Sequence, residues 1–342
     1  MRSYMSMLYG NSAAKERFGH SAEKDSLSHA LIIEGARGSG KKTLARQIIA
    51  SSLCELRHEP SAPLPCGNCR ACRLVLADKA ADVKWISRGE KATLGVDAVR
   101  AEKNDMYLAP NEFARKFYVF EDAHTMTVQA QNALLIALEE PPENVHILLL
   151  CESSDALLTT VKSRAPLVKM QRFTSEELLR WLNTHKPMLT APYQEETEKL
   201  LALLTESDGC IGQALSYLDG KRTDELFEER EITNRLLLSL GTQSFSKLCA
   251  AFSLLPTKRE EIVLCLSSLL RALRDLVLLK RSEDVVLCYF PTALSVPKAC
   301  RSLRTSTLLS AMEAVEDAIR KLERNASSAT VLNLLKYTLK KG

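Results

Sequence analysis

A glycine-rich segment between an apolar run and an amphipathic stretch constrains the fold of this chain most. The segment reads GARGSGK at residues 35–41 and follows the run HALIIE at residues 29–34. Glycines let backbone amides turn toward a bound anion, the N-terminus of the helix expected near Lys42 favours negative charge, and the last lysine reaches the outer phosphates. A glycine-rich turn that binds nothing is the alternative. The strand–loop–helix context favours a phosphate-binding loop.

The position after Lys41 departs from the pattern of a hydrolytic loop. Such loops place Ser or Thr there to ligate magnesium, whereas this chain has Lys42, with Thr43 one position later. A cation at that position repels magnesium unless its side chain points away and Thr43 takes over. We therefore expect ATP as the ligand without efficient hydrolysis. The candidate nucleotide-binding residues in this segment are Gly35, Gly38, Gly40, Lys41, Lys42 and Thr43.

Two further apolar runs occur in the first half of the chain, FYVFE at 117–121 and VHILLLC at 145–151. They are short and rich in branched or aromatic residues, which predicts buried parallel strands. Residues 127–140 show helical spacing of apolar residues, and Pro141 and Pro142 follow as a stop. This alternation predicts an α/β domain with a parallel sheet over residues 1–168.

Strand signals end near residue 170. Residues 174–177 (TSEE) form a helix-capping pattern, and residues 200–218 predict two helices separated at Asp208-Gly209. The remaining segments are long and amphipathic with few glycines, which is typical of a helical bundle. We therefore expect three domains: the α/β domain at 1–168, a small helical domain at 169–224, and an all-α domain at 225–342.

An acidic pair, Glu121-Asp122, ends the second apolar run. ATPases place a magnesium-orienting Asp and then a water-activating Glu at the end of such a strand. The order is reversed here, so the shorter carboxylate of Asp122 stands where the longer one should reach the water. An acidic helix N-cap explains Asp122 equally well, and both readings stay open.

Four of the ten cysteines are clustered, with the spacing C-x11-C-x2-C-x2-C. Four thiolates satisfy a tetrahedral zinc ion and leave no position for substrate, so a structural zinc site is predicted over residues 54–72, against the alternative of four free thiols. Six scattered cysteines are expected in the core. The predicted ligands are Cys54, Cys66, Cys69 and Cys72, and the expected core cysteines are Cys151, Cys210, Cys249, Cys265, Cys288 and Cys300.

The composition of the chain says little about its function. The net charge of +4 permits contact with DNA without arguing for it. No stretch reaches the roughly 18 consecutive apolar residues of a membrane span, and residues 1–18 lack the apolar segment of a secretory signal. The expected compartment is the cytosol, where thiols stay reduced.

Several segments together resemble the clamp-loader family of AAA+ proteins of bacterial DNA polymerase III, over nearly the whole chain. The loop at 35–41 and the four cysteines match its phosphate loop and zinc module. Residues 93–100 (TLGVDAVR) are similar to a segment of its delta-prime and gamma subunits, and residues 132–142 (NALLIALEEPP) to its NALLKTLEEPP helix. Residues 163–165 (SRA) look like its Ser-Arg-Cys motif. That likeness implies that Arg164 is an arginine finger acting on a neighbour's nucleotide.

Departures from the family pattern distinguish its subunits. The gamma/tau motor would carry Asp-Glu in place of Glu121-Asp122, Ser or Thr in place of Lys42, and a nucleotide-sensing arginine in place of Gly212. Three catalytic positions are altered while Arg164 is retained. The resemblance is therefore to the delta-prime type, without ATPase activity of its own, inside the polymerase holoenzyme.

The resemblance implies a place in a hetero-pentameric ring with gamma/tau and delta subunits, held together by a helical collar at 225–342. The ring loads the sliding clamp onto primer-template DNA at the bacterial replisome. A gamma/tau-like motor that tolerates Lys42 is the enzymatic alternative. A zinc-dependent DNA-binding module is disfavoured, because the region between Cys66 and Cys72 has few aromatic residues on which bases could stack.

Overall fold

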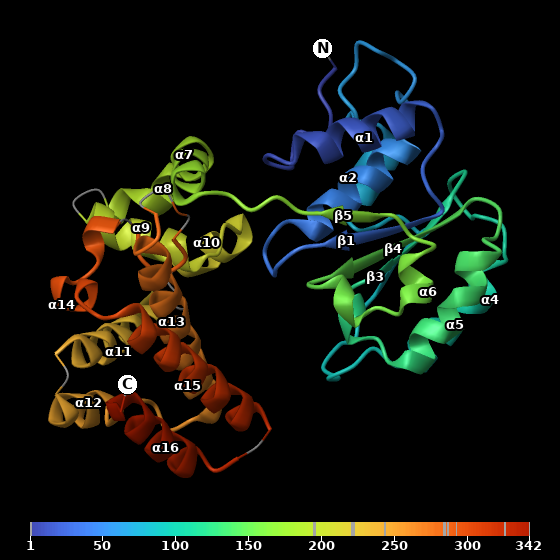
Figure 1. Ribbon diagram of the computed structural model, residues 1–342. Coiled ribbons are helices and arrows are strands. Elements are labelled where there is room, and N and C mark those ends of the chain that lie inside the picture. Colours follow the sequence, from blue (N-terminus) through green and yellow to red (C-terminus); the bar gives the residue numbers. More distant parts are fainter. Residues whose placement is uncertain are drawn as a thin grey trace. The chain divides into compact units, whose positions relative to one another are not determined.

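The computed structural model describes residues 2–193, 196–219, 223–242, 244–282, 285, 287–291, 293–324 and 326–341. The chain divides into two compact units, Met1–Arg172 and Phe173–Gly342 (Figure 1). The expected fold class, an α/β region with a parallel sheet followed by all-helical structure, is confirmed. The division of the helical part into two domains at residues 224 and 225 stays a prediction. No helix in the described ranges is long and apolar enough to cross a membrane.

The first unit contains a five-stranded sheet with the order β2-β3-β4-β1-β5, and every pair of neighbouring strands is parallel. Parallel neighbours need crossover connections, and helices supply them here. The three strands predicted from apolar runs correspond to β1, β3 and β4. The strands are β1 (Ala30–Glu34), β2 (Val83–Ile86), β3 (Lys116–Phe120), β4 (Val145–Cys151) and β5 (Leu167–Lys169).

Alternate residues of the strands point into two separate cores. Ile33, Val119 and Leu148 pack on one face with α1 (Ser12–Glu23), α2 (Lys41–Leu53) and α3 (Arg70–Leu76). Their neighbours along the strands, such as Ile32, pack on the other face with α4 (Val96–Met106) and α5 (Val128–Glu139). Figure 1 shows α1 and α2 on one side of the sheet and α4, α5 and α6 (Thr159–Lys162) on the other. Both faces are covered, which fits the largely apolar sequences of the central strands.

Short elements complete the first unit. Thr127 caps α5 by accepting a hydrogen bond from the amide of Ala130 (3.2 Å), and the helix predicted at 127–140 is confirmed. Two three-residue helices follow β3 and β4. They are η1 (Ala123–Thr125) and η2 (Ser154–Ala156).

Helices are the only regular secondary structure in the described part of the second unit. Thr174 and Glu177 form the predicted capping box, and the predicted helix pair is confirmed on either side of Asp208-Gly209. The helices are α7 (Ser175–His185), α8 (Pro187–Thr190), η3 (Ala191–Tyr193), α9 (Thr197–Glu206), α10 (Ile211–Leu218), α11 (Thr223–Gly241), α12 (Phe245–Phe252), α13 (Arg259–Leu279), η4 (Ala293–Ser295), α14 (Lys298–Arg301), α15 (Thr305–Glu323) and α16 (Ser328–Lys341).

A buried ionic cluster joins three helices of this unit. Glu206, at the end of α9, accepts from Arg230 of α11 (2.5 Å) and Arg271 of α13 (2.6 Å), and its side chain is only 4% exposed. Burial raises the pKa of Glu206, while the two guanidinium groups act against that rise. Since a buried charge needs partners, this cluster ties α9 to the helices that follow it.

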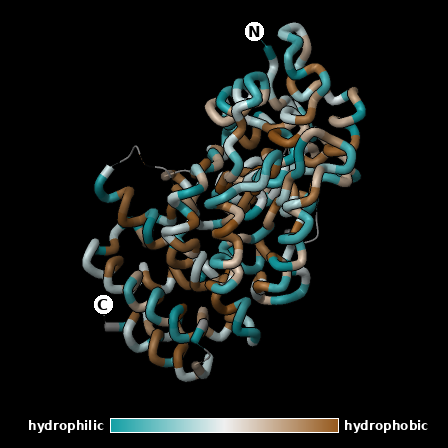
Figure 2. The backbone as a smooth tube through the Cα atoms, turned by 90° about the vertical axis from the view of Figure 1, so that its right-hand side faces the viewer, coloured by the Kyte–Doolittle hydropathy of each residue, from teal (hydrophilic) through white to brown (hydrophobic). Residues whose placement is uncertain are grey.

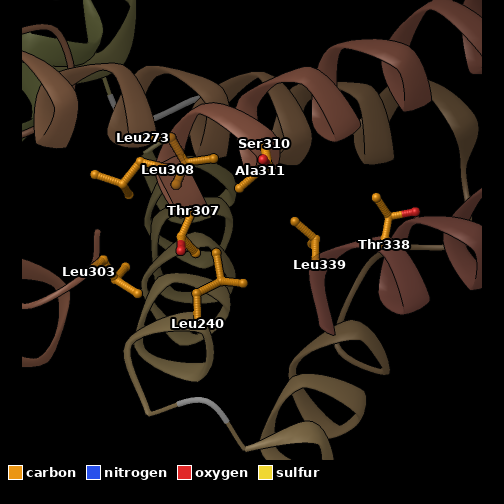
Figure 3. A pocket seen from close by; sticks show the side chains of 9 residues that line it. All are labelled: Leu240, Leu273, Leu303, Thr307, Leu308, Ser310, Ala311, Thr338 and Leu339. Carbon is orange, nitrogen blue, oxygen red and sulfur yellow. The ribbon is translucent and has the colours of Figure 1, made fainter. Parts of the chain in front are cut away.

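Apolar packing holds the rest of the second unit together, and Figure 2 shows hydrophobic and hydrophilic stretches alternating along its helices. A small cavity lies in this core, with Leu240, Leu273, Leu308 and Leu339 around it (Figure 3). Its volume is about 20 Å³, which is room for about one water molecule and no larger ligand.

Candidate functional site

The glycine-rich loop joins β1 to α2, as predicted, and its glycines are required by the backbone. Gly38 and Gly40 adopt positive φ angles of 78° and 95°, a region that side chains disfavour. A Cβ atom on Gly35 would lie 2.6 Å from the Ser39 hydroxyl and 2.8 Å from Met170. The loop therefore has the tight turn and close backbone approach of a phosphate-binding loop. α2 begins at Lys41, one residue earlier than expected.

Inside the loop, Lys41 turns back onto the chain. Its ammonium group donates to the carbonyl oxygens of Gly35 (2.6 Å) and Ala36 (3.0 Å). The hydroxyl of Ser39 is buried and has no hydrogen-bond partner among the described residues. The loop thus gathers an ammonium group, an unsatisfied hydroxyl and the N-terminus of α2 around one concave turn, all of them groups that suit an anion.

Lys42 points toward the acidic pair at the end of β3. Its Nζ lies 2.6 Å from Oε2 of Glu121, whose side chain is 17% exposed. Glu121 and Lys42 therefore meet at the position where a bound magnesium ion would need a carboxylate and a hydroxyl group as ligands. Thr43 follows on α2 and is partly buried.

Asp122 lies apart from this pair. It has a positive φ of 50° and its carboxylate lies 3.6 Å from Nε of Arg88. It stands at the N-cap position of η1, but its side chain makes no capping hydrogen bond there. The helix-cap alternative is therefore met in position but not in its hydrogen bond, and the carboxylate of Asp122 instead pairs with Arg88.

Magnesium does not fit this arrangement. The metal position of such loops is defined by a hydroxyl after the lysine and an acid at the strand end. Here the hydroxyl is replaced by the ammonium group of Lys42, which already neutralises Glu121. A divalent cation would have to displace that ammonium group or bind beside it against charge repulsion.

The four clustered cysteines converge at the far end of α2. Their sulfur atoms all lie within 4.8 Å of one another, and the Cys66 and Cys72 sulfurs are 3.8 Å apart. Sulfurs bound to one tetrahedral zinc ion at about 2.3 Å would be separated by about 3.8 Å. The backbone amides of Cys69 and Cys72 donate to the sulfurs of Cys66 and Cys69 (3.3 and 3.4 Å). The cluster could bind zinc.

The thiols of the cluster differ in pKa. A hydrogen bond from Cys72 lowers the pKa of Cys54 to about 5, and the same contact raises the pKa of Cys72. Zinc binds thiolates, so the chemistry of the donor set suits the metal. Of the six other cysteines, Cys249 and Cys288 are only partly buried, which corrects the expectation that all six lie in the core.

Arg164 follows α6, before β5, as the position of the Ser-Arg-Ala segment predicted. Its Nη2 lies 2.6 Å from Oε1 of Glu139, and its Nη1 donates to the carbonyl of Thr160 (2.9 Å). The side chain is 34% exposed. The guanidinium group is thus oriented by two residues and still accessible.

Comparison with known proteins places these features in a family. The family described as DNA polymerase III, delta subunit, matches residues 10–174. The delta-prime subunit of Escherichia coli is 31% identical over 230 residues, covering 66% of this chain and 64% of that protein. The tau subunit of Bacillus subtilis is 31% identical over 192 residues, which cover 56% of this chain and 33% of that protein. Residues 10–174 therefore match the clamp-loader proteins of DNA polymerase III.

The chain covers less than two thirds of the length of either relative. Its family match lies almost wholly within the first unit, where the loop, the cysteines and Arg164 are found. Among solved structures, a gamma subunit-related protein of Thermotoga maritima aligns over 95% of this chain and 98% of its own at 20% identity, with a TM-score of 0.47.

Two polar residues of the candidate site could not be identified from the sequence. Glu139 belongs to the matched NALLIALEEPP segment but carried no sign that it would pair with Arg164. Arg88 lies in a polar loop and gave no sign of its contact with Asp122. The only available signal for Glu139 was its place near the end of a predicted helix, two residues before Pro141.

Proposed function

We propose that this chain is a delta-prime-like subunit of the clamp loader. It sits in a hetero-pentameric ring with gamma/tau and delta subunits, which loads the sliding clamp onto primer-template DNA in the bacterial cytosol. Delta-prime subunits among its relatives support this proposal. In it, the α/β domain at 1–168 is followed by a lid at 169–224 and a collar at 225–342.

The observation that carries the proposal is the ion pair between Lys42 and Glu121. It places an ammonium group where a motor subunit needs magnesium. A subunit that cannot hold the metal contributes to hydrolysis only by acting on a neighbour. Arg164 suits that role because its guanidinium group is accessible and a phosphate in transfer is stabilised by an arginine supplied from outside.

The remaining candidate residues have supporting roles in this proposal. Gly35, Gly38, Gly40 and Lys41 maintain the loop and the start of α2. Cys54, Cys66, Cys69 and Cys72 bind a structural zinc ion that ties the C-terminus of α2 to α3. Gly212 lies in the first turn of α10, where the motor subunits of the family would carry a nucleotide-sensing arginine.

A gamma/tau-like motor is the second candidate, favoured by the retained Lys41 and by the tau and gamma relatives. The two candidates differ in what Lys41 does. In a delta-prime-like subunit, Lys41→Ala leaves DNA-stimulated ATP hydrolysis by the reconstituted loader within about twofold of the wild-type rate. In a motor, the same substitution lowers that rate and abolishes turnover by the isolated chain.

A further inference from the structure

Lys42 and Glu121 form a charge pair that has no place in the family's metal-dependent site. Lys42 is the second residue of α2 and its side chain is 52% exposed, whereas Glu121 is 17% exposed. The ammonium group reaches across from the loop to the strand end, with 2.6 Å between Nζ and Oε2. The more buried carboxylate thus anchors the more exposed ammonium group.

The anchored ammonium group lies beside a loop that still has the form needed for phosphate. Gly38 and Gly40 keep their positive φ angles, and the hydroxyl of Ser39 is buried without a partner in the described ranges. Lys41 is satisfied by the carbonyl oxygens of Gly35 and Ala36, which it can exchange for phosphate oxygens. The loop has therefore lost its metal ligand without losing its anion-binding groups.

We propose that Lys42 is a built-in counter-cation that replaces magnesium, so that the loop binds a nucleoside diphosphate or triphosphate as a metal-free anion. Glu121 orients Lys42 toward the outer phosphates, as an acid orients magnesium in a motor subunit. Lys41, Lys42 and the amides of the loop supply the positive charge. No hydrolysis follows, because Asp122 is turned to Arg88 and no metal activates the terminal phosphate.

This inference goes beyond the proposed function and fails separately from it, because the trans-acting role of Arg164 does not depend on what the loop of its own chain binds. The inference predicts that magnesium affects the nucleotide affinity of this chain in the opposite sense to that of ordinary phosphate loops. Magnesium strengthens nucleotide binding by ordinary phosphate loops, but here it competes with Lys42 for the same phosphate oxygens.

The test is a fluorescence titration of the whole chain with mant-ADP, in EDTA and in excess magnesium. The wild-type chain is expected to bind in EDTA, and magnesium to leave the affinity unchanged or weaken it. Lys42→Thr restores the hydroxyl of ordinary loops, so its affinity in EDTA falls about tenfold and magnesium recovers the loss. Lys79→Thr, which removes an exposed lysine outside the loop, behaves as wild type.

Manganese provides a second readout. With ADP present, the wild-type chain takes ADP away from Mn²⁺, so the electron paramagnetic resonance signal of free Mn²⁺ is expected to rise above that of Mn²⁺ and ADP alone. Lys42→Thr binds Mn²⁺ together with ADP, so the same signal is expected to fall. The inference is overturned if the wild-type chain binds no mant-ADP in EDTA, if magnesium tightens its binding, or if it holds Mn²⁺ at the nucleotide as the threonine variant does.

Discussion

Arg164 and Glu139 form an ion pair between the ends of two helices, with 2.6 Å between Nη2 and Oε1. Glu139 is the last residue of α5, and Arg164 lies two residues after α6. Both belong to segments on which the clamp-loader resemblance rests. The pair orients the guanidinium group while leaving it 34% exposed, so a phosphate on a neighbouring subunit can compete with the glutamate for it.

Glu139→Gln is therefore expected to free Arg164 without displacing it. An exposed ion pair is worth about 0.2–1 kcal/mol, so the DNA-stimulated ATPase rate of the loader should rise by at most about fivefold. Steady-state hydrolysis by the reconstituted complex measures this. Glu140→Gln, at the adjacent exposed position, is the control and should leave the rate unchanged. A large fall with Glu139→Gln would mean that the finger needs its glutamate to act.

Metal analysis of the purified chain should find one zinc ion per chain. Cys69→Ser removes one of four ligands, so the variant is expected to lose the metal and the first unit to unfold at a lower temperature. Elemental analysis and thermal unfolding measure both effects. Cys249→Ser, at a partly buried cysteine outside the cluster, should retain the zinc. A zinc-free wild-type chain of unchanged stability would contradict the structural role.

Asp82 is expected to make the stability of the first unit depend on pH. Its carboxylate is buried and accepts hydrogen bonds of 2.7–2.8 Å from the backbone amides of residues 111–113. Burial opposes ionisation, but the amide donors outweigh it and hold the pKa of Asp82 below its usual value. The stabilisation is therefore present above the unfolded-state pKa of about 3.9, and it is lost as the pH falls through the lower pKa of the folded chain.

Asp82→Asn is expected to lower the free energy of unfolding by about 2 kcal/mol at neutral pH, because the amide cannot accept all of these bonds. The difference from wild type should shrink toward about pH 3. Urea denaturation across this range measures it, with Glu90→Gln as an exposed control. A difference that is constant with pH would show that the charge of Asp82 does not contribute.

The buried Glu206 cluster makes a prediction for the second unit. Glu206→Ala leaves Arg230 and Arg271 without their shared carboxylate, and losing one partner of a buried ion pair costs about 3–5 kcal/mol. Calorimetric unfolding should show a large loss of stability in the helical unit. Glu231→Ala removes an exposed carboxylate paired with Arg235 and should change stability by less than about 0.5 kcal/mol. Equal effects of the two substitutions would contradict the role of burial.

Whether a strand of the sheet could be predicted from the sequence depended on how many of its residues are buried. β1, β3 and β4 were recognised because almost all of their residues are buried on both faces, so that they read as unbroken apolar runs. β2 and β5 were missed. β2 has one buried residue in four and β5 has one in three, because they lie at the edges of the sheet. A short edge strand lacks the apolar pattern that marks a central one.

At the site, residue types were predictable and side-chain directions were not. The spacing of the cysteines predicted that Cys54 and Cys72 would meet, because a zinc module needs that geometry. The sequence also showed that Lys42 stands where a hydroxyl belongs, but it left open whether the side chain points away. Only the fold brings Glu121, 79 positions later, to within 2.6 Å of it.

The most direct test of the account is DNA-stimulated ATP hydrolysis by a loader reconstituted with Arg164→Ala in this chain. The substitution removes the charge proposed to act on a neighbour's nucleotide, so the rate is expected to fall at least about tenfold while the complex still assembles. Arg164→Lys keeps a charge without the guanidinium geometry and should restore the rate only in part. An Arg164→Ala complex that assembles and hydrolyses ATP at the wild-type rate would contradict the central claim.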